Sequence, residues 1–162
     1  HGDDVADRAE AITLLESRKD DVAAARAIAR DAGSDRFWAL RGQSLQALTA
    51  FPRDSLARAV VDAACRDSDP RIRQAAVGAV ASFRGSDTDS LLTSIALSDA
   101  SPIVRGAALA SYLESAGDAA LPLAREVMAE QSWRNVLRTP AVSVLKGMQS
   151  AAAQSLYHQY AK

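Results

Sequence analysis

Five arginines recur at a nearly constant interval along the 162 residues of this chain. They are separated by 33, 32, 32 and 33 residues, and they are Arg8, Arg41, Arg73, Arg105 and Arg138. A small residue follows each of them at the third position, and Ile, Leu or Val follows at the fourth. A period of this length indicates a repeat protein, in which each small unit buries its apolar face against its neighbours.

One repeat shows the helical pattern most clearly. Asp69 stands at a helix N-cap and Pro70 at the first helical position, where proline loses no backbone hydrogen bond. Ile72, Ala76 and Val80 then recur every four residues. This spacing predicts an amphipathic helix with a narrow stripe of small apolar residues.

Each period has room for two helices, so the sequence predicts an all-α fold, an α-solenoid (α-α superhelix) of about five antiparallel helix pairs. We expect a single domain over residues 1–162, with helix pairs over about 3–33, 34–68, 69–100, 101–131 and 132–162. Within it, Ser101 and Pro102 are expected to open the fourth pair. Gly33 is expected to end the second helix. Pro140 is expected to kink a helix that begins near Ser132.

The aromatic residues and the single cysteine are predicted to have packing roles. Trp38 and Trp133 each open a first helix and are expected to fill gaps between repeats, although an exposed indole would also suit a partner. On the last helix, Tyr157 and Tyr160 are expected to cover the end of the core, with His158 in solvent. Cys65 follows two alanines and is expected to be a buried, unreactive thiol.

Charge and composition argue against several classes of partner. Lys and Arg number 19 against 20 Asp and Glu, and the net charge is −1. There is thus no basic surplus of the kind that indicates nucleic acid or a membrane surface. No apolar run is long enough for a membrane span. We expect a monomer, and the composition does not indicate a compartment. The opening His1-Gly2-Asp3 suits a tag remnant or the edge of a longer protein's fragment.

The residue types that catalytic sites need are missing or scattered. The only histidines are His1 and His158, so the chain holds no His-Glu-x-x-His zinc motif. The eight glycines are dispersed and form no phosphate-binding loop. The sequence therefore predicts no catalytic residue, no metal site and no cofactor in this chain.

The pattern Asp-Pro-x-Ile-Arg-x-Ala-Ala-Val at residues 69–77 resembles HEAT repeats, in which a capped first helix carries an arginine at this place. Tetratricopeptide and ankyrin repeats have similar periods, but their signature residues are missing here. The resemblance implies a HEAT/armadillo-like solenoid whose second helices line the concave side.

Three segments, at residues 7–11, 35–45 and 131–138, resemble a particular domain family. They are similar to "D-R-x-x-A", "D-x-F-W-x-V-R-x-E-A" and "S-W-x-x-x-I-R" in the C-terminal helical domain of bacterial zinc aminopeptidases of the aminopeptidase N type. Gln43 and Ser44 depart from that pattern, which has an acidic and a small residue there. In that family the domain follows the catalytic domain and covers the active-site cavity. The resemblance therefore implies a peptidase fragment, with zinc only in the parent catalytic domain.

The five recurring arginines, named the arginine ladder here, have two interpretations. In the structural one, each pairs with an acid or a carbonyl of the neighbouring repeat, near repeat-start acids such as Asp69, while its alkyl stem covers apolar surface. In the functional one, the ladder lines a groove and holds an acidic partner. We favour the structural interpretation.

The second helices are the expected place of a binding face. Their charged residues have both signs and so do not indicate a ligand; they are Arg26, Arg30, Arg58, Asp62, Arg66, Asp89, Arg125 and Glu126.

Two functions from different classes fit the sequence. The first is a non-catalytic HEAT-like domain that shapes access to the active site of a zinc aminopeptidase, with the catalytic domain of the same polypeptide as its partner. The second is a free-standing HEAT-repeat scaffold that binds a protein or peptide partner through its concave face. An accessory repeat protein of a lyase or cofactor-attachment system is a third possibility.

Overall fold

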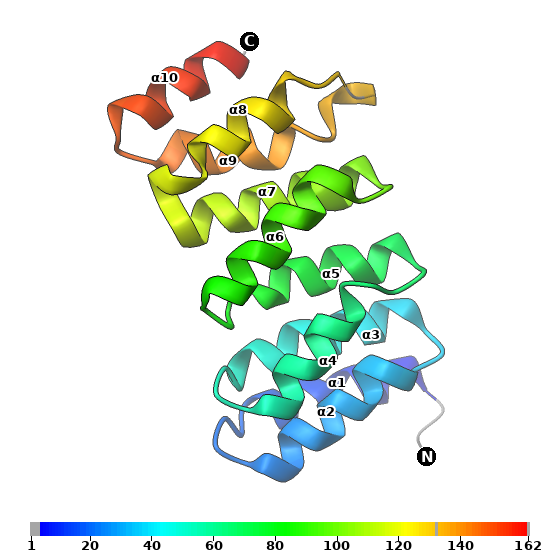
Figure 1. Ribbon diagram of the computed structural model, residues 1–162. Helices are drawn as coiled ribbons and strands as arrows, with labels where there is room; N and C mark the ends of the chain where they lie inside the picture. The colour runs from blue at the N-terminus through cyan, green and yellow to red at the C-terminus, as the bar shows by residue number, and fades with distance from the viewer. Residues whose placement is uncertain (1–3, 132, 162) are drawn as a thin grey trace. The chain divides into compact units, whose positions relative to one another are not determined.

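The computed structural model describes residues 4–131 and 133–161, apart from the side chain of Trp133 (Figure 1). These residues form α-helices and short 3-10 helices, and no strand occurs among them. The fold is therefore the all-α solenoid that the sequence predicts. The chain divides into two compact units, of which the first ends at Phe83 and the second begins at Arg84. The prediction of a single domain over the whole chain stays a prediction.

The first unit is built from two layers of helices (Figure 1). In one layer α1, α3 and α5 pack side by side, and in the other α2 packs against α4. Across the layers, α2 contacts α1 and α3, and α4 contacts α5. The elements are α1 (Val5–Glu16), α2 (Val22–Ser34), α3 (Trp38–Ala47), the 3-10 helix η1 (Leu48–Ala50), α4 (Ser55–Ala64) and α5 (Pro70–Val80).

The second unit repeats this arrangement. Here α7 packs against α9 in one layer, and α8 contacts both α6 and α10 in the other. Across the layers, α7 contacts α6 and α8, and α9 contacts α10. The elements are α6 (Ser86–Ser98), α7 (Pro102–Ala116), η2 (Gly117–Ala120), α8 (Leu121–Ala129), η3 (Trp133–Asn135), α9 (Thr139–Gly147) and α10 (Ala151–Tyr160).

Aspartates start several of these helices. The carboxylates of Asp4, Asp21, Asp54 and Asp69 accept hydrogen bonds from backbone N–H groups in the first turns of α1, α2, α4 and α5. Each such cap is worth about 1 kcal/mol of helix stability. Ser101 occupies the N-cap position of α7 as predicted, but its side chain makes no capping hydrogen bond.

Two predicted helix boundaries are wrong. Gly33 does not end α2, which continues to Ser34 and stops where Asp35 becomes extended. Such an exit does not need the left-handed residue that glycine usually supplies. Pro140 does not kink a helix, because it lies in the first turn of α9, where proline is favoured. Before it, Arg134 and Asn135 are left-handed, with φ of 50° and 57°, so a right-handed helix cannot run through them. Ser132, the predicted start, lies outside the described residues.

The core is made of small and medium aliphatic side chains, which let the helices approach closely. Gly106 on α7 marks the closest approach, because a Cβ atom there would lie 2.7 Å from the carbonyl oxygen of Leu137 and 3.0 Å from that of Val136. The largest fully buried side chains are Ile12, Ile28, Leu45, Leu48 and Ile72 in the first unit, and Leu92, Leu109, Leu113, Met128, Leu137, Leu145 and Leu156 in the second. Each contributes roughly 1.5–3 kcal/mol of transfer free energy.

Candidate functional site

In the first unit, ladder arginines connect a first helix to the loop that follows its partner helix. Arg8 on α1 forms an ion pair with Asp35 in the loop between α2 and α3, with 3.0 Å between Nε and Oδ2. Arg41 on α3 pairs in the same way with Asp67 in the loop between α4 and α5. The Nε–H of Arg41 also donates to the carbonyl oxygen of Ala32 near the end of α2, at 3.0 Å. These ion pairs and this hydrogen bond therefore connect the end of one helix pair to the start of the next.

In the second unit, Arg105 on α7 has the same arrangement. Its Nε–H donates to the carbonyl oxygen of Ala96 on α6 at 2.8 Å, and its guanidinium forms two hydrogen bonds with the Glu130 carboxylate. Arg138, which precedes α9, donates to the backbone carbonyl oxygen of Glu130 at 2.9 Å and lies over the ring of Tyr160. A two-pronged guanidinium–carboxylate contact fixes orientation as well as position. Glu130 thus joins two ladder arginines.

The loop before α5 concentrates such contacts in the first unit. Arg73 on α5 donates to the backbone carbonyl oxygens of Asp67 and Ser68, at 2.9 and 3.3 Å. Partial burial alone would raise the pKa of the Asp67 carboxyl, but hydrogen bonds from the Asp69 N–H and the Arg41 guanidinium outweigh it. The pKa of Asp67 is therefore held below its ordinary value, and the folded state favours the ionised carboxylate.

The acids in these loops form a second periodic series, which the sequence reasoning missed. Asp35, Asp67 and Asp99 lie 32 residues apart, and each carboxylate accepts a hydrogen bond from the backbone N–H two residues later, at 2.7–2.8 Å. Asp69, the acid named as a candidate ladder partner, instead forms an ion pair with Arg71 beside it. The 32-residue spacing of the three aspartates was the signal that identifies them.

The charged candidates on α2, on α4 and just after α4 differ in their exposure to solvent. Arg26 and Arg30 are exposed on α2, and Arg66 is exposed just after α4. Arg30 has Asp31 beside it, 3.4 Å away, a weak surface contact. On α4, Arg58 and Asp62 are half-buried and form an ion pair, with 2.7 Å between Nε and Oδ2. The exposed charges of the set in the first unit are therefore all arginines.

The candidates in the second unit do not share one sign. Asp89 on α6 is half-buried, whereas Arg125 and Glu126 are exposed next to each other on α8. The structure thus brings Arg26, Arg30 and the α4 residues into one helix layer of the first unit, and it places the other three candidates in the second unit. A binding role for any of them stays a prediction.

Trp38 does not fill a gap between repeats, contrary to the prediction. It is 42% exposed at the first residue of α3, beside Phe37, which is 41% exposed, with 6.2 Å between the ring centroids. The guanidinium of Arg71 on α5 lies 4.5 Å from the centre of the indole. The side chain of Trp133 lies outside the described residues.

The aromatic residues of α10 lie at intermediate depth. Tyr157 and Tyr160 are half-buried, and His158 is exposed, as predicted, with its ring 5.2 Å from that of Tyr157. A role of the two tyrosines in covering the end of the core stays a prediction.

Cys65 is buried at the end of α4, as predicted. Burial, together with the nearby Asp62 carboxylate, raises the pKa of its thiol to about 12, so the reactive thiolate is scarce at neutral pH. Within residues 4–131 and 133–161, no group of three or more His, Cys, Asp or Glu side chains is placed to hold a metal ion. No helix in this described part is long and apolar enough to cross a membrane.

Comparison with known proteins agrees with this repeat geometry. A family model described as HEAT repeats matches residues 27–113, which is more than half of the chain and includes three ladder arginines. Searches of curated proteins and of solved structures find no match. The periodic arginines and the two-layer packing are thus those of a member of this family: the chain belongs to the HEAT-repeat proteins.

Proposed function

We propose that this HEAT-repeat chain is a scaffold that binds a partner protein through the outward face of α2 and α4. The proposal rests on the aliphatic and arginine side chains that are exposed on this face. Val22 on α2 is 54% exposed and Leu56 on α4 is 43% exposed, with the exposed Arg26 and Arg30 on α2 and the exposed Arg66 just after α4. Arginine is enriched at protein interfaces, and burying the exposed Val22 and Leu56 against a partner would remove apolar surface from water.

The ladder arginines supply a second argument for placing the partner on this face. Their side chains are occupied within the fold: Arg8, Arg41 and Arg105 are 25%, 22% and 14% exposed and form ion pairs. Recruiting one of them for a partner would break contacts that connect successive helix pairs. The exposed Arg30 contacts Asp31 beside it on α2, and the exposed Arg66 donates to the carbonyl oxygen of Asp62 on α4. Neither contact connects successive helix pairs, so these exposed arginines are better suited to binding.

A charge-reversal capture experiment tests this proposal. The wild-type chain, the double variant Arg26→Glu/Arg30→Glu and the matched control Arg36→Glu/Arg84→Glu are immobilised, and proteins retained from a cell extract are identified. All four arginines are exposed, so folding is preserved. We expect a protein that the wild type and the control retain and the α2 variant loses. Equal retention by all three, or retention of nothing specific, contradicts the proposal.

A second candidate function is the access-shaping domain of a zinc aminopeptidase. The supporting observation is the exposed pair Phe37 and Trp38, which lies within the segment that resembles that family's C-terminal domain. Two neighbouring exposed aromatic rings suit contact with an adjoining catalytic domain. In this proposal the zinc belongs to the catalytic domain, and the chain described here carries no chemistry.

An assay on the full product of the encoding gene tests the second candidate. Zinc-dependent cleavage of short and long peptides is compared with and without residues 1–162, and with the variant Trp38→Ala. We expect removal of the region to change the preference for peptide length. A gene product without zinc-dependent peptidase activity, or unchanged length preference, contradicts this function.

A further inference from the structure

One stripe of residues on α1 differs from its counterparts in the next two repeats. In α1 the stripe is exposed to solvent, and it consists of Asp7, Ala11, Leu14 and, just after the helix, Arg18. The residues one and two periods later are at most 5% exposed; they are Leu40, Ser44, Ala47 and Phe51 in the second repeat and Ile72, Ala76, Ala79 and Phe83 in the third. The α1 stripe is therefore a surface that the later repeats bury.

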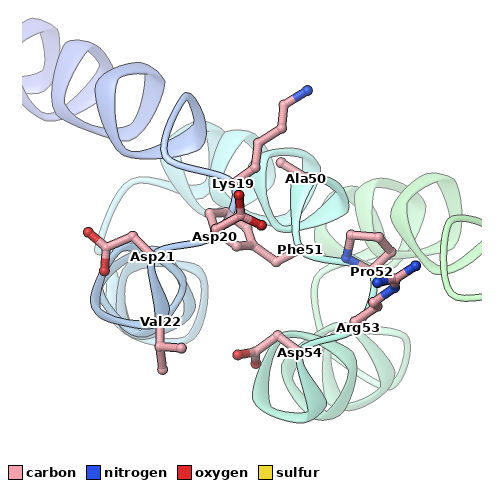
Figure 2. Close-up of a pocket in the computed structure, with 9 residues that line it drawn as sticks. All are labelled: Lys19, Asp20, Asp21, Val22, Ala50, Phe51, Pro52, Arg53 and Asp54. Atoms are coloured by element: carbon pink, nitrogen blue, oxygen red, sulfur yellow. The ribbon is translucent and has the colours of Figure 1, made fainter.

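In the second repeat, the preceding helix pair covers this surface. Helix α3 packs against α1 and α2. Phe51, which follows η1, lines the same pocket as Lys19, Asp20 and Asp21 of the turn between α1 and α2, and Figure 2 shows its ring beside Asp20. No described helix pair precedes α1, so the α1 stripe is open to solvent.

The residues of the α1 stripe suit neither a further HEAT repeat nor solvent alone. Asp7 and Arg18 stand where the later repeats bury a leucine or isoleucine and a phenylalanine, so a repeat stacked here would bury two charges. Leu14 stands where the later repeats have alanine, and at 61% it is the most exposed large apolar side chain among the described residues. A terminal surface that only had to be soluble would carry a polar residue at this place.

The order of residues along the α1 stripe is self-complementary. Asp7 and Arg18 are equally far from the midpoint of the stripe, and so are Ala11 and Leu14. Arg18 continues the last turn of the helix, because its backbone N–H donates to the carbonyl oxygen of Leu15 at 3.0 Å. When two copies of α1 lie antiparallel, each aspartate therefore faces the other copy's arginine, and each leucine faces the other copy's alanine.

Both charged ends of the α1 stripe are available for such contacts. Asp7 forms no ion pair among the described residues. The side chain of Arg18 is 66% exposed, and its nearest approach to Asp21, 4.0 Å, is too long for a hydrogen bond. A partner's carboxylate and guanidinium could therefore reach both groups without breaking a strong contact within the chain.

The other acids of α1 do not oppose the antiparallel arrangement. Glu10 would lie opposite Leu15 of the second copy, and Glu16 would lie opposite Ala9. No two like charges within α1 would therefore face each other.

We propose that α1 is the contact surface of a symmetric dimer, in which the α1 stripes of two copies of this chain pack antiparallel. Burying Leu14 against the other copy's Ala11 would remove apolar surface from water, and two ion pairs between Asp7 and Arg18 would fix the direction of packing. A contact between two helices is smaller than the roughly 1,200–2,000 Å² of a stable interface, so the dimer is expected to be weak. This inference replaces the expectation of a monomer, and it does not depend on the proposed binding face of α2 and α4.

Sedimentation equilibrium over a concentration series tests the inference. We expect the wild-type chain to show a monomer–dimer equilibrium with a dissociation constant on the order of 100 μM. Leu14→Ser is expected to weaken the dimer roughly tenfold or more, because two leucines lose their burial. Leu97→Ser, a change of an exposed leucine on α6, is the matched control and is expected to leave the constant unchanged. A wild-type chain that stays monomeric at about 1 mM, or equal effects of the two variants, overturns the inference.

Charge reversals test the antiparallel direction. Asp7→Lys and Arg18→Glu each turn both ion pairs into repulsions, so each is expected to weaken the dimer roughly tenfold. The double variant Asp7→Lys/Arg18→Glu again places opposite charges across the contact and is expected to recover the wild-type constant within about threefold. All three variants change exposed residues, so folding is preserved. Single reversals without effect, or a double variant as weak as the single ones, overturn the inference.

Discussion

Arg41 on α3 and Asp67 in the loop between α4 and α5 form an ion pair whose side chains are only 22% and 16% exposed. Each group also forms a hydrogen bond with the backbone: Arg41 donates to the carbonyl oxygen of Ala32, and Asp67 accepts from the N–H of Asp69. One contact thus links three successive segments of the first unit. A pair that is partly shielded from water and supported by additional hydrogen bonds is stronger than an exposed ion pair.

Gly106 is predicted to be intolerant of any side chain. In Gly106→Ala the new Cβ would lie 2.7 Å from the backbone carbonyl oxygen of Leu137, so a helix or the 136–137 backbone must shift. Overpacking of this kind costs about 1–3 kcal/mol. Urea unfolding followed by circular dichroism measures it.

Gly33→Ala is the matched control for that substitution. Gly33 lies in the last turn of α2, and a Cβ there meets nothing within 4 Å. Alanine is favoured over glycine in helices by about 0.5–1 kcal/mol, so this variant is expected to be unchanged or more stable. Equal losses of unfolding free energy in the two variants would show that the close backbone contact at Gly106 does not determine the effect of the substitution.

Acid is predicted to weaken the fold through Asp67. Its folded-state pKa lies below the ordinary value because the Asp69 N–H and the Arg41 guanidinium outweigh the effect of burial. The resulting stability is present above the unfolded-state pKa, near about 4, and is lost as the pH falls through the lower folded-state pKa. Stability is therefore expected to decline from about pH 5 downward.

The variant Asp67→Asn checks this assignment. It is expected to be less stable than the wild type at pH 7 and to lose less stability on going to low pH, as measured by thermal unfolding across a pH series. Glu10→Gln, an exposed change on α1, serves as control and is expected to keep the wild-type profile. An unaltered pH profile in Asp67→Asn would exclude Asp67 as a source of the acid sensitivity.

Fold class was predictable because the signals are local and periodic. Asp69 and Pro70 indicate a helix start, because aspartate is a favoured N-cap and proline a favoured first helical residue. The structure begins α5 at Pro70. The last repeat was predicted less well. There the chain turns through the left-handed Arg134 and Asn135, neither of which is a glycine that would have indicated such a turn. The sequence predicts a kink at Pro140 because it places the start of the helix near Ser132, whereas α9 begins at Thr139.

The contacts between repeats were less predictable than the helices. Ladder arginines were recognisable from their spacing, but their acceptors depend on where the loops lie in space. Glu130 replaces the aspartate of earlier repeats and lies 31 residues after Asp99, so it falls outside the strict 32-residue series. Exposure was also not predictable at Trp38, because a large ring at a helix end is as compatible with a covered gap as with solvent.

Cys65 is predicted to react slowly with thiol reagents in the folded protein. Its thiol is buried, and its pKa is raised to about 12, so both access and thiolate are lacking at pH 7.5. Labelling by a chromogenic disulfide reagent is expected to be complete within the mixing time in denaturant and to be slower by orders of magnitude in buffer. Equally fast labelling in both conditions would mean that the end of α4 opens readily.

The central claim is that the arginine ladder connects successive repeats. A double-mutant cycle with Arg41→Ala and Asp67→Ala, measured by urea unfolding, tests it most directly. Because the cycle cancels the separate contacts of each residue, it isolates their interaction. The account predicts a coupling energy of about 1 kcal/mol, larger than for the pair Asp69 and Arg71, in which the arginine side chain is 56% exposed. Effects that add within about 0.3 kcal/mol would contradict the claim.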